Sequence, residues 1–198
     1  NMSRIKVGEQ LNSADLTGFC FPVYSFGIPR LCRKYLKSIQ PFKNKQNIFI
    51  LITAGDADES GLSIREVTEI LRTKNCSVIY SGVVQMPINW TTSPQPPFPP
   101  DKEEAKQIVD KAVIFTEKIA HDIISGTEKF HKFNYPLRIS RFMFYFDYLM
   151  FRYIGISNMW RNFKVYENCS GCGTCAKICP TQSIRIIDNK PQWTSTCE

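Results

Sequence analysis

The chain has 198 residues, which is enough for one domain of ordinary size and a small second one. Its hydrophobic content of 43% predicts a packed core, and its net charge of +7 favours acidic partners. The basic residues are scattered rather than gathered in one block, which argues against a nucleic-acid-binding protein. No stretch is apolar for long enough to span a bilayer.

Three apolar runs predict buried β-strands, and two amphipathic segments between them predict helices. The predicted strands cover residues 16–24, 47–54 and 76–85, and the predicted helices cover residues 28–39 and 63–74. Ser63 and Glu66 have the spacing of a capping box, and Asn75 is expected to end its helix in a left-handed conformation. The alternation of strands and helices predicts an α/β fold with a parallel, doubly wound sheet.

The second half of the chain begins with a proline-rich loop over residues 91–100. Caps and periodicity then predict a long helix over residues 101–125, ended by Gly126. We expect its buried face to consist of Ala105, Ile108, Val109, Ala112, Ile119, Ala120 and Ile123. An aromatic-rich helical segment follows from Arg141, and we interpret residues 142–159 as a buried or partner-facing helix.

Four closely spaced cysteines dominate the C-terminal part. Cys169, Cys172, Cys175 and Cys179 form the run C-x2-C-x2-C-x3-C-P, which is typical of bacterial ferredoxins. The short spacings let the thiolates converge on one 4Fe-4S cluster, and Gly171 and Gly173 permit the backbone to turn tightly. A zinc site is the alternative, but zinc modules usually separate two C-x2-C pairs widely. Such clustering also favours metal ligation over disulfides, and therefore a reducing cytoplasm.

The remaining cysteines divide into two groups. In two-cluster ferredoxins the fourth cysteine of a run binds the other cluster, so Cys179 and Cys197 could serve a second cluster. The alternative for Cys197 is an exposed, unpaired thiol. Cys20, Cys32 and Cys76 each stand in an apolar setting, and we predict that they are small core residues.

Several motifs together resemble the family in which a ferredoxin is fused behind a flavodoxin-like domain. They are residues 18–24 (GFCFPVY), 53–55 (TAG), 86–90 (MPINW), the cysteine run and Trp193. The resemblance implies a flavodoxin-like parallel sheet with helices on both faces over residues 1–126, a helical, aromatic-rich linker over residues 127–163, and a small α+β ferredoxin-type domain over residues 164–198.

In that family the flavin lies at the carboxyl ends of the parallel strands. The resemblance therefore assigns FMN contacts to Pro22, Tyr24, Ser25, Phe26, Gly27, Thr53, Ala54 and Gly55. Tyr24 and Phe26 could instead be ordinary packing aromatics. The family's first strand and phosphate loop have no counterpart before Leu16, so the resemblance implies that FMN binds poorly to these residues alone. The chain starts at Asn1 and stops after Cys197 and Glu198, and we expect both ends to be cut.

These features favour an electron-transfer protein that carries 4Fe-4S clusters, two of them in the intact protein. Its partner would be another redox protein, for which an acidic one fits the positive charge. A flavin-dependent oxidoreductase is the alternative, but His121 and His131 do not form a recognisable acid–base pair. A zinc-dependent interaction module is a third hypothesis.

Overall fold

The structure is a computed structural model that describes residues 8, 10–24, 27–56, 62–89, 98–131, 138–150, 153–154, 158 and 160–197. The chain divides into two compact units, one made mostly of Val7–Asn134 and the other mostly of Tyr135–Glu198. Each unit has its own sheet, and each is described separately below.

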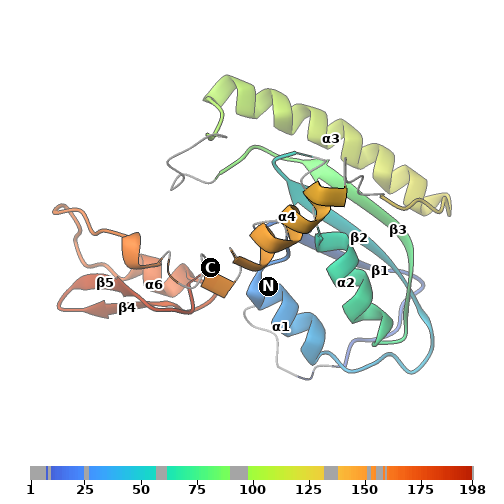
Figure 1. The fold of residues 1–198 in the computed structure, drawn as a ribbon, viewed down its shortest axis with the longest axis horizontal. Coiled ribbons are helices and arrows are strands. Elements are labelled where there is room, and N and C mark those ends of the chain that lie inside the picture. Colours follow the sequence, from blue (N-terminus) through green and yellow to red (C-terminus); the bar gives the residue numbers. More distant parts are fainter. Residues whose placement is uncertain are drawn as a thin grey trace. The chain divides into compact units, whose positions relative to one another are not determined.

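The first unit contains a parallel three-stranded sheet with helices between its strands (Figure 1). In chain order its elements are β1 (Thr17–Pro22), α1 (Arg30–Ser38), β2 (Gln46–Ala54), α2 (Ser63–Arg72), β3 (Cys76–Gln85) and α3 (Lys102–Ile124). The strands lie in the order β1-β2-β3, so each helix crosses between neighbouring strands. The predicted α/β fold with a parallel sheet is confirmed.

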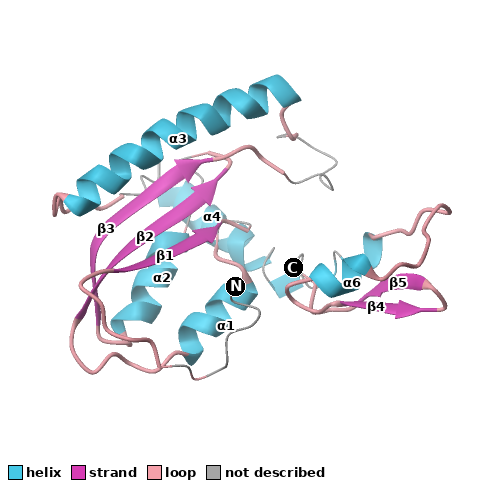
Figure 2. Ribbon diagram, turned by 180° about the vertical axis from the view of Figure 1, so that it is seen from behind, coloured by secondary structure: helices cyan, strands magenta, loops and turns pink. Residues whose placement is uncertain are grey.

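Helices cover both faces of this sheet, with α1 and α2 on one face and α3 on the other (Figure 2). The strands alternate accordingly, because successive side chains point to opposite faces. Phe19 pairs with Ile50 and Phe21 with Ile52 in the register of β1 and β2, and all four are buried. On the opposite face, a second cluster consists of Tyr80, Val84, Ala112 and Ile119, with Phe49 and Leu51 at its margin.

The cover provided by α3 is narrower than the sequence predicts. Ala112 and Ile119 are buried, whereas Val109 and Ala120 are exposed, so their predicted burial is wrong. The helix packs against β3 and leaves the α3-facing side of β1 open. Cys20 lies on that side and is exposed, which contradicts its predicted core position. Cys32 and Cys76 are buried as predicted.

Local signals set both ends of α3 and the C-terminal end of α2. Asp101 caps α3, because its Oδ1 accepts hydrogen bonds from the backbone N–H groups of Glu103 (3.0 Å) and Glu104 (2.8 Å). Asn75 adopts the predicted left-handed conformation, with φ of 63°, and Gly126, the predicted stop of α3, has φ of 74°.

The predicted capping box at the start of α2 is wrong. The N-cap is Leu62, and Ser63 is the first helical residue, where its side chain is fully buried on the same face as Val67 and Leu71. Glu66 does not fold back onto the helix end, because it forms an ion pair with Arg33 of α1. A charge pair between the two helices therefore replaces the predicted cap.

The second unit contains α4 (Arg138–Met150), the 3-10 turn η4 (Trp160–Asn162), the short helix α6 (Thr174–Ile178), and the strands β4 (Ile184–Ile187) and β5 (Lys190–Trp193). Strands β4 and β5 form an antiparallel hairpin. Its two-residue turn, Asp188-Asn189, has positive φ at both positions (50° and 57°), as this turn type requires. In the described part of the chain, every helix is too short or too polar to cross a membrane.

Candidate iron–sulfur site

The loop before α6 owes its path to two glycines. Gly171 and Gly173 have φ of 70° and 73°, in the left-handed region that other residues rarely adopt. Gly173 is also the N-cap of α6. The chain can therefore turn twice within the cysteine run, which brings Cys169 and Cys172 before the helix and Cys175 onto it.

The hairpin of β4 and β5 supports this loop from one side. A Cβ atom at Gly171 would lie 2.5 Å from the backbone oxygen of Asn189 in the hairpin turn. A Cβ atom at Gly173 would lie 3.7 Å from Ile186 Cγ1, so this isoleucine covers the loop. The rings of Phe163 and Trp193 pack 5.4 Å apart and join the start of the module to the end of β5.

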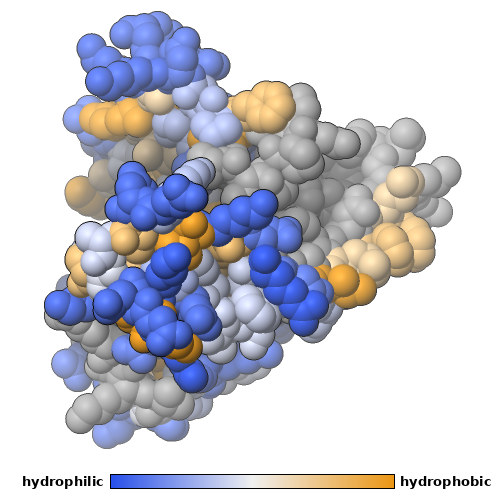
Figure 3. Space-filling model, turned by 90° about the vertical axis from the view of Figure 1, so that its left-hand side faces the viewer, coloured by the Kyte–Doolittle hydropathy of each residue, from blue (hydrophilic) through white to orange (hydrophobic). Residues whose placement is uncertain are grey.

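The four cysteines of the run differ in exposure. Cys169 and Cys172 are exposed, whereas Cys175 and Cys179 are half-buried. In the view of Figure 3, hydrophobic side chains lie at the surface among hydrophilic ones. Ile178 and Tyr166 are among the exposed apolar residues of the module. Two of the four cysteines in the loop therefore lie at the surface of the module.

Hydroxyl groups favour the thiolate form of Cys172. Its Sγ lies 3.4 Å from Thr174 Oγ1. Hydrogen bonding from the Thr174 side chain and backbone, and from Ser170, lowers the pKa of the Cys172 thiol to about 7. Because the thiolate is the form that binds metal, this loop favours the ligand state before any iron is bound.

Cys179 has a similar, partly buried environment. Burial acts to raise the pKa of its thiol, but hydrogen bonds from Ser183 and Thr181 outweigh it and lower the pKa to about 7. Cys179 Sγ lies 3.3 Å from the fully buried Ser183 Oγ and 3.4 Å from Thr181 Oγ1. Thr181 donates its own hydroxyl proton to Ser183 Oγ at 3.0 Å, which leaves the Ser183 proton for the sulfur.

Sequence analysis missed these hydroxyl residues, although a signal for them exists. Thr174 and Thr181 each follow a cysteine by two positions, and Ser183 follows Cys179 by four. Short polar side chains at such spacings often bond back to nearby groups. The hydrogen bond from Ser183 to Cys179 also depends on the complete burial of the Ser183 side chain, and the spacing of the cysteines does not reveal that burial.

In the described residues, no three His, Cys, Asp or Glu side chains lie close enough to hold a single metal ion. A 4Fe-4S cluster does not need such a group, because each of its four cysteines binds a different iron atom. The donor set fits the cluster: four thiols in one run, two of them with lowered pKa values, around a glycine loop.

Cys197 lies after the hairpin rather than within the run. It is half-buried, and its backbone N–H donates to Thr194 O at 3.0 Å, in a turn that follows β5. Thr194 in turn donates to Ser183 O at 2.9 Å, which ties this turn to the residues after Cys179. The role of Cys197 as a ligand stays a prediction.

Comparison with known proteins identifies the module. Residues 163–185 match the family of 4Fe-4S binding domains, and all four cysteines of the run lie in this match. No curated protein sequence matches the chain. The C-terminal part of the chain is therefore a 4Fe-4S binding domain of the ferredoxin type, and the predicted iron–sulfur cluster is favoured over the zinc alternative.

The predicted flavin residues lie at the carboxyl ends of β1 and β2, except Ser25 and Phe26, which fall outside the described residues. The backbone N–H of Val23 donates to Thr53 O at 2.9 Å, so the two loops meet. Tyr24 and Gly27 exchange backbone hydrogen bonds, and Tyr24 is exposed. Pro22 and Thr53 are also exposed, whereas Gly27 and Ala54 are buried.

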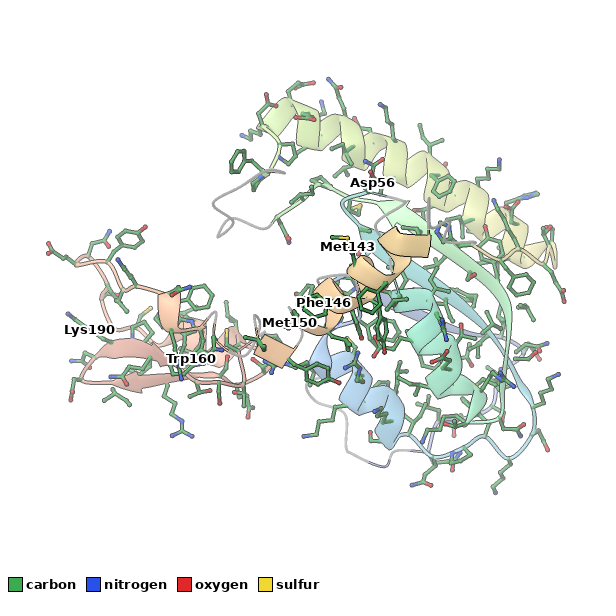
Figure 4. The ribbon with its side chains drawn as sticks, viewed as in Figure 1. Asp56, Met143, Phe146, Met150, Trp160 and Lys190 are labelled. Atoms are coloured by element: carbon green, nitrogen blue, oxygen red, sulfur yellow. The ribbon has the colours of Figure 1, made fainter. Side chains whose placement is uncertain are left out.

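Gly55 has a structural role of its own. A Cβ atom at this position would collide with Ile88, so the loop after β3 packs directly on the glycine. Gln85 Nε2 donates to Gly55 O at 3.1 Å, and Met86 N donates to Ala54 O at 2.8 Å. Asp56 follows at the same edge of the sheet (Figure 4). The three loops therefore converge, as the carboxyl ends of adjacent parallel strands should.

Proposed function

We propose that this protein is a one-electron carrier whose 4Fe-4S domain exchanges electrons with a partner protein. The observation that carries the proposal is the matched cysteine run, folded as an accessible loop with hydroxyl groups beside two of its sulfurs. When bound, a 4Fe-4S cluster accepts and donates single electrons at a potential that its surroundings adjust.

The chain's own residues have three tasks in this proposal. Cys169, Cys172, Cys175 and Cys179 would supply thiolates, and the low pKa values of Cys172 and Cys179 keep two of them ready. The buried Ser183 hydroxyl would stabilise the extra negative charge of the reduced state. Ile186, which lies beside Gly173, would limit the access of water to one side of the loop, and this would also affect the potential.

Anaerobic reconstitution with iron and sulfide tests the proposal. We expect a brown protein that dithionite bleaches and that gains a paramagnetic resonance signal on reduction. The reduced protein should pass one electron per cluster to methyl viologen or another small acceptor. Cys172→Ser should lose most of the iron, whereas Cys20→Ser, the matched change of an exposed cysteine outside the run, should keep it. A colourless, zinc-loaded product would contradict the proposal.

We also infer that Cys179 and Cys197 serve a second cluster, as in two-cluster ferredoxins. Cys175→Ser and Cys179→Ser should then perturb different clusters, and Cys197→Ser should perturb the one that Cys179 serves. Paramagnetic resonance of the three variants distinguishes the signals. If Cys175→Ser and Cys179→Ser perturb one cluster and Cys197→Ser none, the domain holds a single cluster.

An acidic redox partner is the kind that we propose. The exposed charged residues of the module are mainly basic, namely Arg161, Lys164, Lys177, Arg185 and Lys190, against Glu167 and Asp188. A complementary acidic surface would steer encounters toward the cysteine loop. The reducing cytoplasm is the compartment that fits free thiols and an iron–sulfur domain.

FMN is the second cofactor that we propose, at the carboxyl edge of the parallel sheet. The hydrogen bond from Val23 to Thr53 supports it, because it brings the loops after β1 and β2 together. Tyr24, which is exposed at this edge, would stack on the isoalloxazine ring. A flavin here would connect one-electron and two-electron partners.

Fluorescence titration separates ring binding from phosphate binding. The family's phosphate loop has no counterpart before Leu16 in this sequence. FMN and riboflavin, which differ only in the phosphate group, should therefore bind this chain equally and weakly. Tyr24→Ala should weaken both, whereas Tyr166→Ala, at an exposed tyrosine in the other unit, should weaken neither. Equal titrations for the two variants would contradict the proposed flavin site.

No observation in the described residues favours a substrate-specific flavin oxidoreductase, since His121 is exposed on α3 and His131 lies beyond it.

A further inference from the structure

Helix α4 exposes an unusual amount of apolar surface. Its exposed side chains include Phe142 (73% exposed), Met143 (58%) and Phe146 (52%), together with Tyr145 and Met150. We call these five residues the aromatic face of α4; Met143, Phe146 and Met150 follow one another along the helix in Figure 4. Single exposed apolar residues are ordinary, but a contiguous set of large ones marks an interaction surface.

The five residues form one continuous arc around the helix. At about 100° per residue, they spread over about 160° of its circumference. A helix that pairs with one other helix uses a narrower seam. Tyr153 and Ile154, which follow α4 in the sequence, are also exposed. An exposed apolar arc of this width fits a flat apolar surface, such as that of a lipid layer, better than a single partner helix.

Positive charge surrounds this surface in the sequence. Residues 135–164, which belong to the same unit as α4, contain Arg138, Arg141, Arg152, Arg161 and Lys164, and Asp147 is their one acidic residue. Five basic residues and one acidic residue give this segment a net charge of +4. Arg161 and Lys164 are exposed. Such a segment is complementary to a surface of negative charge and repels another copy of itself.

We propose that α4 lies in the surface of a bilayer that contains anionic lipid, with its aromatic face among the upper acyl chains. Aromatic and methionine side chains would bury their apolar area there, while lysine and arginine contact the phosphate groups. The helix lies along the membrane and does not cross it. The proposal concerns binding alone and does not depend on the iron–sulfur domain being an electron carrier.

Vesicle sedimentation tests the proposal with the 198-residue chain. Vesicles of phosphatidylglycerol and phosphatidylcholine should bring the protein down, and vesicles of phosphatidylcholine alone should bring down much less. The double change Phe142→Ser and Phe146→Ser should weaken partitioning at least about tenfold, because two large apolar side chains no longer enter the lipid. High ionic strength should also weaken it.

Ile124→Ser is the matched control. Ile124 is 86% exposed, but it lies at the end of α3 in the other unit. Its change should leave vesicle binding as it is. Circular dichroism of each variant confirms that the chain is still folded.

Three results would overturn the proposal. The chain fails to sediment with anionic vesicles, or the double variant sediments as well as the unchanged chain. Alternatively, the unchanged chain forms dimers without lipid that the double variant cannot form, and neither binds vesicles; the aromatic face is then a contact between copies of the chain.

Discussion

Among the residues beside the cysteine run, Ser183 gives the clearest test of how the protein adjusts the reduction potential. Its buried hydroxyl accepts a proton from Thr181 and is free to donate its own to Cys179 Sγ. A hydrogen bond to a ligating sulfur stabilises the more negative, reduced cluster. Ser183→Ala should therefore lower the reduction potential of the cluster that Cys179 binds, by about 30–60 mV.

Thr174→Ala is the comparison for this measurement. Thr174 contacts Cys172, which is exposed, so water can replace the lost hydroxyl and the potential should shift by much less. Protein-film voltammetry of both reconstituted variants gives the two shifts. Equal shifts, or an unchanged potential in Ser183→Ala, would show that burial of the hydroxyl has no importance.

Cys76 links stability to pH in the other unit. Burial raises the pKa of its thiol to about 11 from an ordinary value of 9.0, and its Sγ donates weakly to Lys74 O at 3.8 Å. Folding thus favours the neutral thiol, and stability falls as pH rises from about 9 toward 11. The expected loss is up to about 1.4 kcal/mol per pH unit.

Cys76→Ala should remove this contribution to the pH dependence. Urea unfolding of the metal-free chain and of the variant, at several pH values above 8, gives the two slopes. The difference between them isolates Cys76 from other groups that titrate in this range. Parallel slopes would mean that the thiol titrates normally in the folded protein.

At the scale of single residues, the sequence identified the cysteines but not their surroundings. The spacing from Cys169 to Cys179 specifies the cofactor, because only a cluster needs four thiolates so close together. The hydroxyl of Ser183 acts through burial, which depends on where β4 begins. Cys20 was predicted to be buried but is exposed. The apolar residues around it in the sequence do not reveal that α3 leaves this side of β1 uncovered.

Among the elements, the glycine loop provides the sharpest test. Gly171→Ala should cost about 1–2 kcal/mol for its positive φ, and more because its Cβ meets the backbone of Asn189. The variant should lose iron or fail to incorporate it. Gly126→Ala has the same backbone requirement, with φ of 74°, but a Cβ there meets no atom within 4 Å.

The two variants can be compared by thermal unfolding and by iron content after reconstitution. Gly126→Ala should lose only the backbone contribution and keep its full iron content. If Gly171→Ala also keeps its iron, the hairpin turn does not constrain the cysteine loop.

At the start of α2, the structure and the capping hypothesis predict opposite effects of Ser63→Ala on stability. Ser63 Oγ is buried and has no hydrogen-bond partner in the part of the chain that the structure describes. Removing such a group relieves its desolvation cost, so Ser63→Ala should stabilise the protein by up to about 1 kcal/mol. A capping serine would instead lose about 1 kcal/mol. Urea denaturation measures the sign, and Ser38→Ala, which removes a hydroxyl bonded to Tyr35 O, is the control.

Elements with strong local signals were predictable, and those that depend on packing were less so. The apolar runs of β2 and β3 indicate buried parallel strands, and Asp101 and Gly126 define the ends of α3. The buried face of α3 was predicted too wide, because periodicity shows which residues could be buried but not how far the sheet extends beneath them. The predicted capping box failed because Glu66 pairs with Arg33, far away in sequence.

For the whole molecule, the two compact units carry different features. The unit of Tyr135–Glu198 contains the 4Fe-4S domain, and the unit of Val7–Asn134 brings three loops together at the carboxyl ends of its strands. The sequence predicted both, because a cysteine run and a strand–helix alternation are local patterns. It could not show how exposed each surface is, since exposure depends on every element of a unit.

The excess of basic over acidic side chains, +7 in the sequence, should influence how fast the reduced protein meets its acceptors. Electron transfer to ferric EDTA, an anion, should slow as ionic strength rises, and transfer to cobalt(III) tris(phenanthroline), a cation, should accelerate.

Two double variants separate the effect of charge near the cysteine loop from the effect of total charge. Lys177→Glu with Lys190→Glu changes the iron–sulfur module, and Lys43→Glu with Lys45→Glu changes the other unit; each lowers the net charge from +7 to +3. Stopped-flow measurement should show a several-fold slower reaction with ferric EDTA for the first pair, and less than about a twofold change for the second, because charge close to the site of transfer is screened least. Equal rates for the two variants would mean that only total charge matters, and the basic residues of the module would then give no reason to expect an acidic partner at the cysteine loop.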